Sequence, residues 1–190
     1  MSADLPDELL DVEVEEPTGD GRRGTQPGQR EGGEPEETER FVVFRVGEQS
    51  LAVSVDAVKG IVKMKEQTRV PRASPAVDGI MDLRGEITAV IDARAHFYTT
   101  ADETPVERQR VVVFDRATDK QPVGVRVDHV IGVELFPLRT IVPSEHTEAD
   151  AADHPLVTAI IHREDDGEVT EQIGLLDIKG FLAASGQGPE

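Results

Sequence analysis

Short runs in which apolar and polar residues alternate occupy much of the chain from residue 41 onward. Leu51, Val53 and Val55 alternate with small or polar neighbours, which is the period-two pattern of a strand with one buried face. Comparable runs occupy residues 41–46, 86–92, 110–115 and 122–127. Clusters such as GEQ and RATDKQ, which are typical of turns, follow the first and third of these. The pattern therefore predicts a mainly β protein.

Two segments of this pattern are similar to each other at an offset of 72 residues. LAVSVDAVKGIV at 51–62 aligns with VGVRVDHVIGVE at 123–134. The identical positions are Val53/Val125, Val55/Val127, Asp56/Asp128, Val58/Val130 and Gly60/Gly132. Further along, with a few inserted residues, GEIT at 85–88 matches GEVT at 167–170. Internal repetition of this kind predicts one structural unit that is used twice.

Each repeat holds about five short strands and one short helical turn, VDAV in the first copy and VDHV in the second. With so little helix, closing each sheet into a small barrel is an economical way to hide its faces and edges. We expect two packed barrels within a domain at 39–184, about residues 39–108 and 109–184, between which strands can be exchanged. Near the end of the domain, Ile178, Phe181 and Leu182 have helical spacing and predict a short closing helix.

The two ends of the chain differ in composition from the predicted barrels. Residues 1–38 contain six Gly, four Pro and no aromatic residue, and they carry a formal charge of −9. Such a segment cannot bury enough apolar surface to offset its ordering entropy, so we expect a disordered acidic tail, and disorder also at 185–190. Within the tail, DELLDVEVEE offers an alternative, a short docking motif that folds on a partner, but a solvated tail is favoured.

The charge of the chain bears on its environment and on one class of partner, nucleic acid. Its formal charge is −18, with 38 acidic residues against 20 basic ones, and arginine outnumbers lysine 15 to 5. The acidic residues are spread through the whole chain rather than gathered in one block, which favours a surface adapted to concentrated salt, as in a halophilic archaeon. The same charge disfavours nucleic acid as a partner, because phosphate contacts need clustered Lys and Arg. No run approaches ~18 apolar residues, and no secretory signal opens the chain. We expect a cytoplasmic protein without direct membrane insertion.

A single arginine interrupts the acidic pattern at a predicted hairpin. Leu83, Arg84 and Gly85 precede the strand at 86–92, and the second copy has the acidic turn HREDDGEVT in the corresponding place. An acidic residue followed by glycine is a common hairpin signal, so closing the barrel does not require a cation there. This favours recognition as the role of Arg84. The alternative is that Arg84 caps backbone carbonyls or pairs with Asp82 or Asp92.

An enzyme or a metal site finds little support. Six aspartates could supply a carboxylate pair for acid–base or hydrolytic chemistry, namely Asp56, Asp82, Asp92, Asp115, Asp128 and Asp177. Several of them occupy repeat-related strand ends, where aspartate ordinarily caps turns or helices. GxSxG, HExxH and glycine-rich phosphate loops do not occur, and there is no cysteine. His146, His154 and His162 match no standard ligand spacing. We therefore expect no enzyme, no metal and no cofactor.

Four separated segments together resemble the CheW family of chemotaxis adaptor proteins. They are FVVF at 41–44, VDAVKGI at 55–61, VPRASPAVDGIMDLRGEITAVIDARAHF at 70–97 and VGVRVDHVIGV at 123–133. The resemblance covers about residues 40–184. It implies two five-stranded SH3-like β-barrels and a non-enzymatic adaptor. The adaptor links the regulatory domain of the histidine kinase CheA to the cytoplasmic tips of methyl-accepting chemoreceptors, in receptor arrays at the membrane. The alternative is a CheW-like scaffold of another two-component pathway.

The resemblance also assigns site residues. Gly79, Leu83, Arg84 and Gly85 match the segment implicated in kinase and receptor contact. Val55, Val58 and Ile61 correspond to an apolar ridge in the groove between the barrels, where a receptor hairpin tip docks. Helical residues three apart share a face, so these three are also consistent with a stripe for an amphipathic helix, or with ordinary core.

The chain departs from the family pattern at three positions. The family usually has Asn at Asp82 and Pro at Ala89, and it often has an acidic residue at Gly60. The change at Gly60 implies that one polar contact to a partner is missing or moved.

Overall fold

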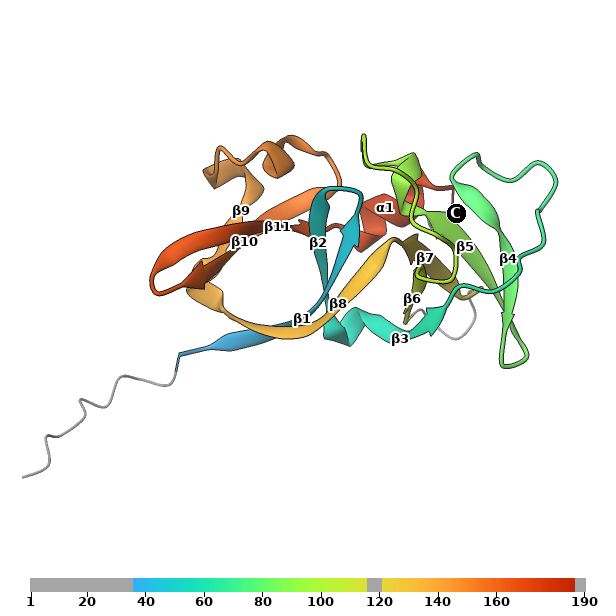
Figure 1. The fold of residues 1–190 in the computed structure, drawn as a ribbon, viewed down its shortest axis with the longest axis horizontal. Helices are drawn as coiled ribbons and strands as arrows, with labels where there is room; N and C mark the ends of the chain where they lie inside the picture. Colours follow the sequence, from blue (N-terminus) through green and yellow to red (C-terminus); the bar gives the residue numbers. More distant parts are fainter. Residues whose placement is uncertain (1–35, 116–120, 187–190) are drawn as a thin grey trace, which may run out of the picture. The chain divides into compact units, whose positions relative to one another are not determined.

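The computed structural model describes residues 36–115 and 121–186, which form two β-sheets, a few short 3-10 helices and one α-helix (Figure 1). The six-stranded sheet has the order β8-β1-β2-β11-β10-β9, and the five-stranded sheet has the order β3-β6-β7-β5-β4. The strands are β1 Thr38–Val46, β2 Gln49–Ser54, β3 Val58–Lys63, β4 Val77–Leu83, β5 Glu86–Asp92, β6 Arg110–Phe114, β7 Val123–Val127, β8 His129–Pro137, β9 Ile141–Pro143, β10 Val157–Asp165 and β11 Glu168–Leu176. The predicted mainly β architecture with two sheets is confirmed.

The two sheets exchange strands between the repeats. The six-stranded sheet takes β1 and β2 from the first copy and β8 to β11 from the second, while β3 to β7 form the other sheet. If β1 to β5 are matched with β6, β7, β8, β10 and β11, the two strand orders become identical, and β9 is the one addition. In both sheets the second strand of one copy pairs in parallel with the last strand of the other. The boundary expected near residue 108 therefore does not separate the two sheets, because the strands on either side of it, β5 and β6, both belong to the five-stranded sheet.

The crossing from one sheet to the other takes place at the repeat-related aspartates. In the first copy, the 3-10 helix η1 (Val55–Ala57) carries an exposed Asp56. In the second copy Asp128 lies between β7 and β8 without a helix, and the predicted helical turn there is wrong. The reason is that Asp128 is buried and its Oδ2 accepts a hydrogen bond from Gly47 N at 2.6 Å, which holds the chain close to the β1–β2 turn.

Three hydrophobic clusters lie on the faces of the two sheets. The largest joins both sheets and includes Phe44 of β1 and Phe114 of β6. A second cluster, on the other face of the six-stranded sheet, contains Phe41 and Phe136. A third, on the other face of the five-stranded sheet, contains Met81 and three valines, one of which is Val113. Burial on both faces explains why the middle of β5 does not alternate between buried and exposed residues.

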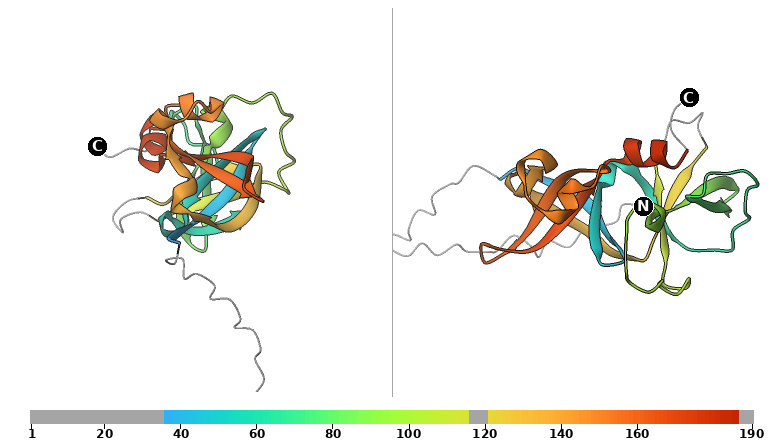
Figure 2. Two further views of the ribbon diagram at one scale, coloured as in Figure 1. Left: turned by 90° about the vertical axis from the view of Figure 1, so that its left-hand side faces the viewer. Right: turned by 90° about the horizontal axis from the view of Figure 1, so that it is seen from above.

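The predicted closing helix is confirmed as α1 (Ile178–Ala184), with Phe181 and Leu182 buried. It lies at the junction of the two sheets (Figure 2). The described part of the chain extends past both predicted borders. At one end β1 begins at Thr38, and at the other Ser185 is fully buried. The rest of the predicted tail and of the C-terminal end lies outside the described residues.

Candidate protein-binding site

The β4–β5 and β10–β11 hairpins have the same backbone and different charges at the turn. Arg84 and Gly85 have φ values of 58° and 87°, and Asp166 and Gly167 have 49° and 84°. Positive φ at both central residues defines the two-residue type I′ turn, for which Asp-Gly is a preferred pair. A residue with a Cβ pays about 1–2 kcal/mol in this left-handed conformation, and aspartate is among the few that tolerate it. Arginine therefore has no conformational advantage at the turn.

Arg84 is free of the structural roles considered for it. It is exposed, and it makes no hydrogen bond or ion pair with another described residue. Asp82 instead accepts a hydrogen bond from Gly85 N through Oδ1 at 2.8 Å, and Asp92 pairs with Arg126 at 2.5 Å. The turn is thus stabilised by Asp82, which leaves the guanidinium of Arg84 available to an external group.

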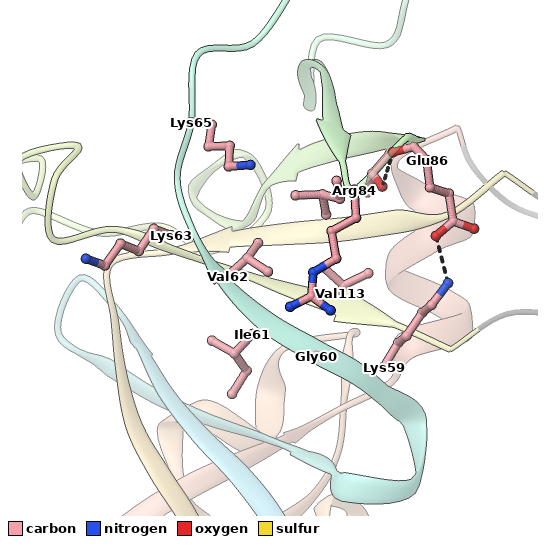
Figure 3. Close-up of a pocket in the computed structure, with 11 residues that line it drawn as sticks. Lys59, Gly60, Ile61, Val62, Lys63, Lys65, Arg84, Glu86 and Val113 are labelled. Atoms are coloured by element: carbon pink, nitrogen blue, oxygen red, sulfur yellow. Dashed lines mark hydrogen bonds and ion pairs between the residues drawn. The ribbon is translucent and has the colours of Figure 1, made fainter.

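Arg84 extends over a pocket between the hairpin and β3 (Figure 3). We call this the basic pocket; its volume is about 570 Å³. Its lining includes four cations, Lys59, Lys63, Lys65 and Arg84, and one carboxylate, Glu86. Its apolar lining includes Ile61, Val62, Leu83 and Val113, beside the buried Thr88. The pocket therefore combines an apolar interior with a cationic rim.

The rim stands out against the charge of the rest of the chain. Three of the five lysines in the sequence line this pocket, although the chain carries a net charge of −18. Lys59 Nζ lies 2.7 Å from Glu86 Oε2, which compensates one charge. Lys63, Lys65 and Arg84 have no acidic partner among the described residues. Sequence reasoning missed the lysines, but their concentration within seven positions was a signal that could have found them.

The other hairpin positions assigned by resemblance have separate tasks. Leu83 lines the basic pocket, and Gly85 provides the second positive φ of the turn. Gly79 lies away from the turn, where a Cβ would come within 2.5 Å of Thr68 O. Thr68 forms an isolated bridge with Ile80, with both backbone hydrogen bonds at 2.9 Å. Gly79 is therefore required for close approach of the segment before β4.

Val55, Val58 and Ile61 do not share a helical face, so the predicted helical stripe is wrong. Only Val55 lies in η1, because the chain enters strand β3 at Val58. Val55 and Val58 are partly buried against the large central cluster, whereas Ile61 is 39% exposed and lines the basic pocket. Along β3 residues alternate, so Ile61 shares its face with Lys59 and Lys63.

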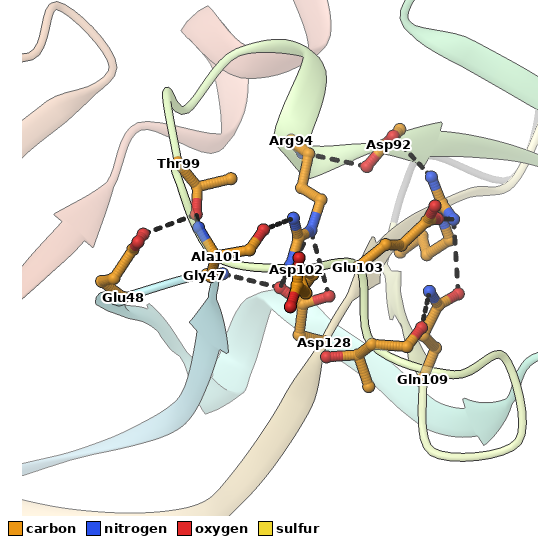
Figure 4. Close-up of polar contacts among 12 residues, drawn as sticks. Gly47, Glu48, Asp92, Arg94, Thr99, Ala101, Asp102, Glu103, Gln109 and Asp128 are labelled. Carbon is orange, nitrogen blue, oxygen red and sulfur yellow. Dashed lines mark hydrogen bonds and ion pairs between the residues drawn. The ribbon is translucent and has the colours of Figure 1, made fainter.

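Several of the aspartates considered as possible catalytic groups form hydrogen bonds or ion pairs that hold the fold together. Arg126 pairs with Asp78 at 2.7 Å. It also pairs with Asp92 at 2.5 Å and with Glu103 at 2.9 Å, two acids that are labelled in Figure 4. Burial raises the pKa of Asp78, against the lowering effect of the Arg126 charge. The other arginine of this region, Arg94, pairs with Asp128 at 2.8 Å. These contacts join β4, β5 and β7 to the loop that follows β5.

The histidines do not form a metal site among the described residues, where no group of three or more potential ligands comes together. His154 stacks on Phe97 and approaches His96 O through Nε2 at 3.0 Å. His146 is exposed beside Glu145, and His162 lies in β10. These three histidines thus lie in separate local environments. Within the described ranges, no helix is long and apolar enough to cross a membrane.

The duplicated pair of small sheets defines a two-sheet β protein with a cationic hairpin at its surface. Residues 40–185 match the CheW-like domain model, and the chain belongs to this family of non-catalytic scaffold proteins. It is 30% identical over 116 residues to "Chemotaxis protein CheW" of Bacillus subtilis, which covers 50% of this chain and 74% of that protein. It is 26% identical to "Protein PilI" of Pseudomonas aeruginosa, over 73% of this chain and 76% of that protein.

The fold has a solved counterpart. The crystal structure of the scaffolding protein TtCheW from Thermoanaerobacter tengcongensis superposes with a TM-score of 0.62 at 22% sequence identity. The match covers 79% of this chain and 91% of that one. The domain-model match confirms the expected family, and the structural match confirms the expected two-barrel architecture.

Proposed function

We propose that this chain is a non-enzymatic adaptor that couples the histidine kinase CheA, through its regulatory domain, to the cytoplasmic tips of chemoreceptors. Membership of the CheW-like family supports an adaptor. The observation that carries the proposal is Arg84, an exposed cation without a described partner, held in a left-handed turn that does not need it. A guanidinium makes paired hydrogen bonds to carboxylates and carbonyls, which suits specific contact with another protein.

In this proposal the hairpin residues Leu83, Arg84 and Gly85 contact the kinase or the receptor, and Gly79 keeps the hairpin in place. Val55, Val58 and Ile61 contribute apolar surface to the receptor contact. Affinity then comes from apolar burial together with short hydrogen bonds. Charges at the surface add little at high salt, because the Debye length is about 3 Å at ~1 M ions.

The test is a pulldown at high salt with two purified bait proteins, the CheA regulatory domain and a receptor cytoplasmic fragment. Arg84→Ala is expected to weaken capture of at least one bait about tenfold, which corresponds to the loss of charge-assisted hydrogen bonds. Asp166→Ala changes the matching turn of the other hairpin and serves as the control. Circular dichroism must show that both variants stay folded.

Two results would contradict the proposal. The unaltered chain could fail to bind either bait, or Arg84→Ala could unfold the protein and so reveal a structural role. Capture of the histidine kinase of another two-component pathway in place of CheA would assign the chain to that pathway.

A further inference from the structure

We propose that the basic pocket binds an acidic protein segment of the partner, with an apolar side chain inserted into the pocket and neighbouring carboxylates on Lys63, Lys65 and Arg84. This inference rests on the proposed adaptor function and specifies the chemistry of the bound segment. It follows from a comparison of this pocket with the matching place in the other sheet.

The register of the two sheets identifies the matching residues. β11 pairs with β2 through Gly174 and Leu51, and β5 pairs with β7 through Ala89 and Val123, which is the repeat counterpart of Leu51. Extending both registers gives the counterparts of four pocket residues: Val62 corresponds to Glu134, Leu83 to Arg163, Glu86 to Glu171 and Thr88 to Ile173. In this structural register Glu86 corresponds to Glu171, whereas the sequence match of GEIT with GEVT aligned it with Glu168. Two residues in or packed against the third hydrophobic cluster, beside the pocket, have counterparts as well, Met64 in Phe136 and Val111 in Phe41.

In the six-stranded sheet this place is closed from within. Arg163 Nη2 lies 2.6 Å from Glu134 Oε2, and Nη1 of the same side chain pairs with Glu171. The guanidinium carbon of Arg163 is 6.0 Å from the ring centroid of Phe136, which itself packs against Phe41 at 6.2 Å. One internal arginine, two glutamates and two phenylalanines therefore fill the space.

In the five-stranded sheet the same place lacks these groups. The positions of Arg163 and Glu134 are taken by the apolar Leu83 and Val62, and the two phenylalanines are replaced by Met64 and Val111. Smaller side chains inside and the missing internal ion pair leave the pocket open. A partner that enters with an apolar side chain would restore the packing that the phenylalanines provide in the other sheet.

The charge of the rim selects the polar part of that partner. Glu86 is already paired with Lys59, so the described residues leave three cations, Lys63, Lys65 and Arg84, without an acid. In the other sheet Arg163 is paired with two glutamates of the chain itself, whereas the described residues offer no acid to these three cations. An acidic segment provides them, while a basic or neutral one does not.

The first experiment uses a defined probe. A short fluorescein-labelled peptide with one leucine between glutamates is titrated with the full chain, and binding is followed by fluorescence anisotropy. A matched peptide with glutamine in place of each glutamate is the control. We expect the glutamate peptide to bind at least tenfold more tightly at low salt, with a difference that shrinks as salt is added. Equal affinities for the two peptides would overturn the inference.

Two variants locate the binding. The double change Lys63→Gln with Lys65→Gln should weaken binding of the glutamate peptide several-fold, as expected for two exposed charges. Lys179→Gln, on α1, should leave it unchanged.

The pair Val62→Glu with Leu83→Arg introduces the closing ion pair of the other sheet, and it should remove binding while circular dichroism shows a folded chain. Peptide binding that survives in this folded variant would overturn the inference. If the double variant does not fold, Thr88→Ile, which fills the same space with the counterpart residue, replaces it, and peptide binding that survives there would likewise overturn the inference.

The pulldown separates this inference from the function on which it rests. If, in the same pulldown repeated at low salt, Arg84→Ala weakens capture of the bait proteins but the two lysine changes do not, the acidic segment is refuted and the adaptor function stands. If the unaltered chain captures neither bait, the adaptor function fails whatever the peptide does.

Discussion

Strands β3 and β8 have the same place in the two sheets but carry opposite kinds of outer surface. Each follows a crossing aspartate, and within its sheet each is paired with one neighbour. The exposed residues of β3 are Lys59, Ile61 and Lys63, and their counterparts on β8 are Ile131, Val133 and Leu135. Val133 is 56% exposed and Leu135 63%. One strand thus presents a basic face and the other an apolar one.

The comparison shows which residues stay similar in the two copies and which differ. The inward residues of the two strands must fill a core, so they are apolar in both copies, apart from the glycines and the internally paired Glu134. Outward residues contribute little to stability, since most surface substitutions change it by less than about 0.5 kcal/mol. The outer faces could therefore diverge, and they provide two different surfaces for contacts with other proteins.

The largest expected effect concerns neighbouring residues of β8. Phe136→Ala removes a ring that is 5% exposed and packs against Phe41, so the free energy of unfolding should fall by about 3–5 kcal/mol. Leu135→Ala, one position away on the outer face, should change it by less than about 0.5 kcal/mol. Urea unfolding followed by circular dichroism measures both. Similar losses for the two variants would show that the outer face of β8 is also part of the core.

The two crossings give the next effect. Asp128→Asn weakens a partly buried ion pair with Arg94, whose side chain is 17% exposed, and should cost about 3 kcal/mol. Asp56→Asn changes an exposed residue in the matching position and should be nearly neutral. The measurement is again urea unfolding. Equal effects would mean that the two crossings are equivalent, against the difference in their burial.

Sequence reasoning predicted those features that depend on local patterns. The alternating runs, the repeat at 51–62 and 123–134, and the helical spacing of Phe181 and Leu182 all gave correct elements. The four segments that include the motif around Arg84 gave the family. The prediction of a helical turn at VDHV was wrong because tertiary contacts of Asp128 decided the local conformation.

The arrangement of the strands could not be read from local patterns. β2 and β3 are separated by three residues but belong to different sheets, since exchanged strands satisfy the same pairing rules as unexchanged ones. The basic pocket was missed for a similar reason. Val113 and Thr88 meet Lys63 and Arg84 only after β3 and the β4–β5 hairpin are placed on either side of β6 and β7.

A smaller effect is expected at the two hairpin turns. Arg84→Gly relieves the left-handed conformation of a residue with a Cβ and should stabilise the fold by about 1 kcal/mol, while capture of the bait proteins weakens. Asp166→Gly should stabilise less, because aspartate tolerates this conformation. Thermal unfolding and the pulldown are measured on the same samples. A loss of stability in Arg84→Gly would show that the side chain supports the hairpin.

The smallest effect distinguishes a packed histidine from an exposed one. Burial lowers the pKa of His96, and the nearby His154 lowers it further, against the opposing charge of Asp92. At pH values between the lowered pKa of His96 in the folded chain and the ordinary pKa of about 6.5, His96 binds a proton more readily in the unfolded chain than in the folded one. His96 therefore reduces the free energy of unfolding as the pH falls below ~6.5. Replacing His96 with Gln should make the free energy of unfolding less dependent on pH across this range. His129→Gln, at an exposed position on β8, is the matched control, and the same response in both variants would exclude burial as the cause.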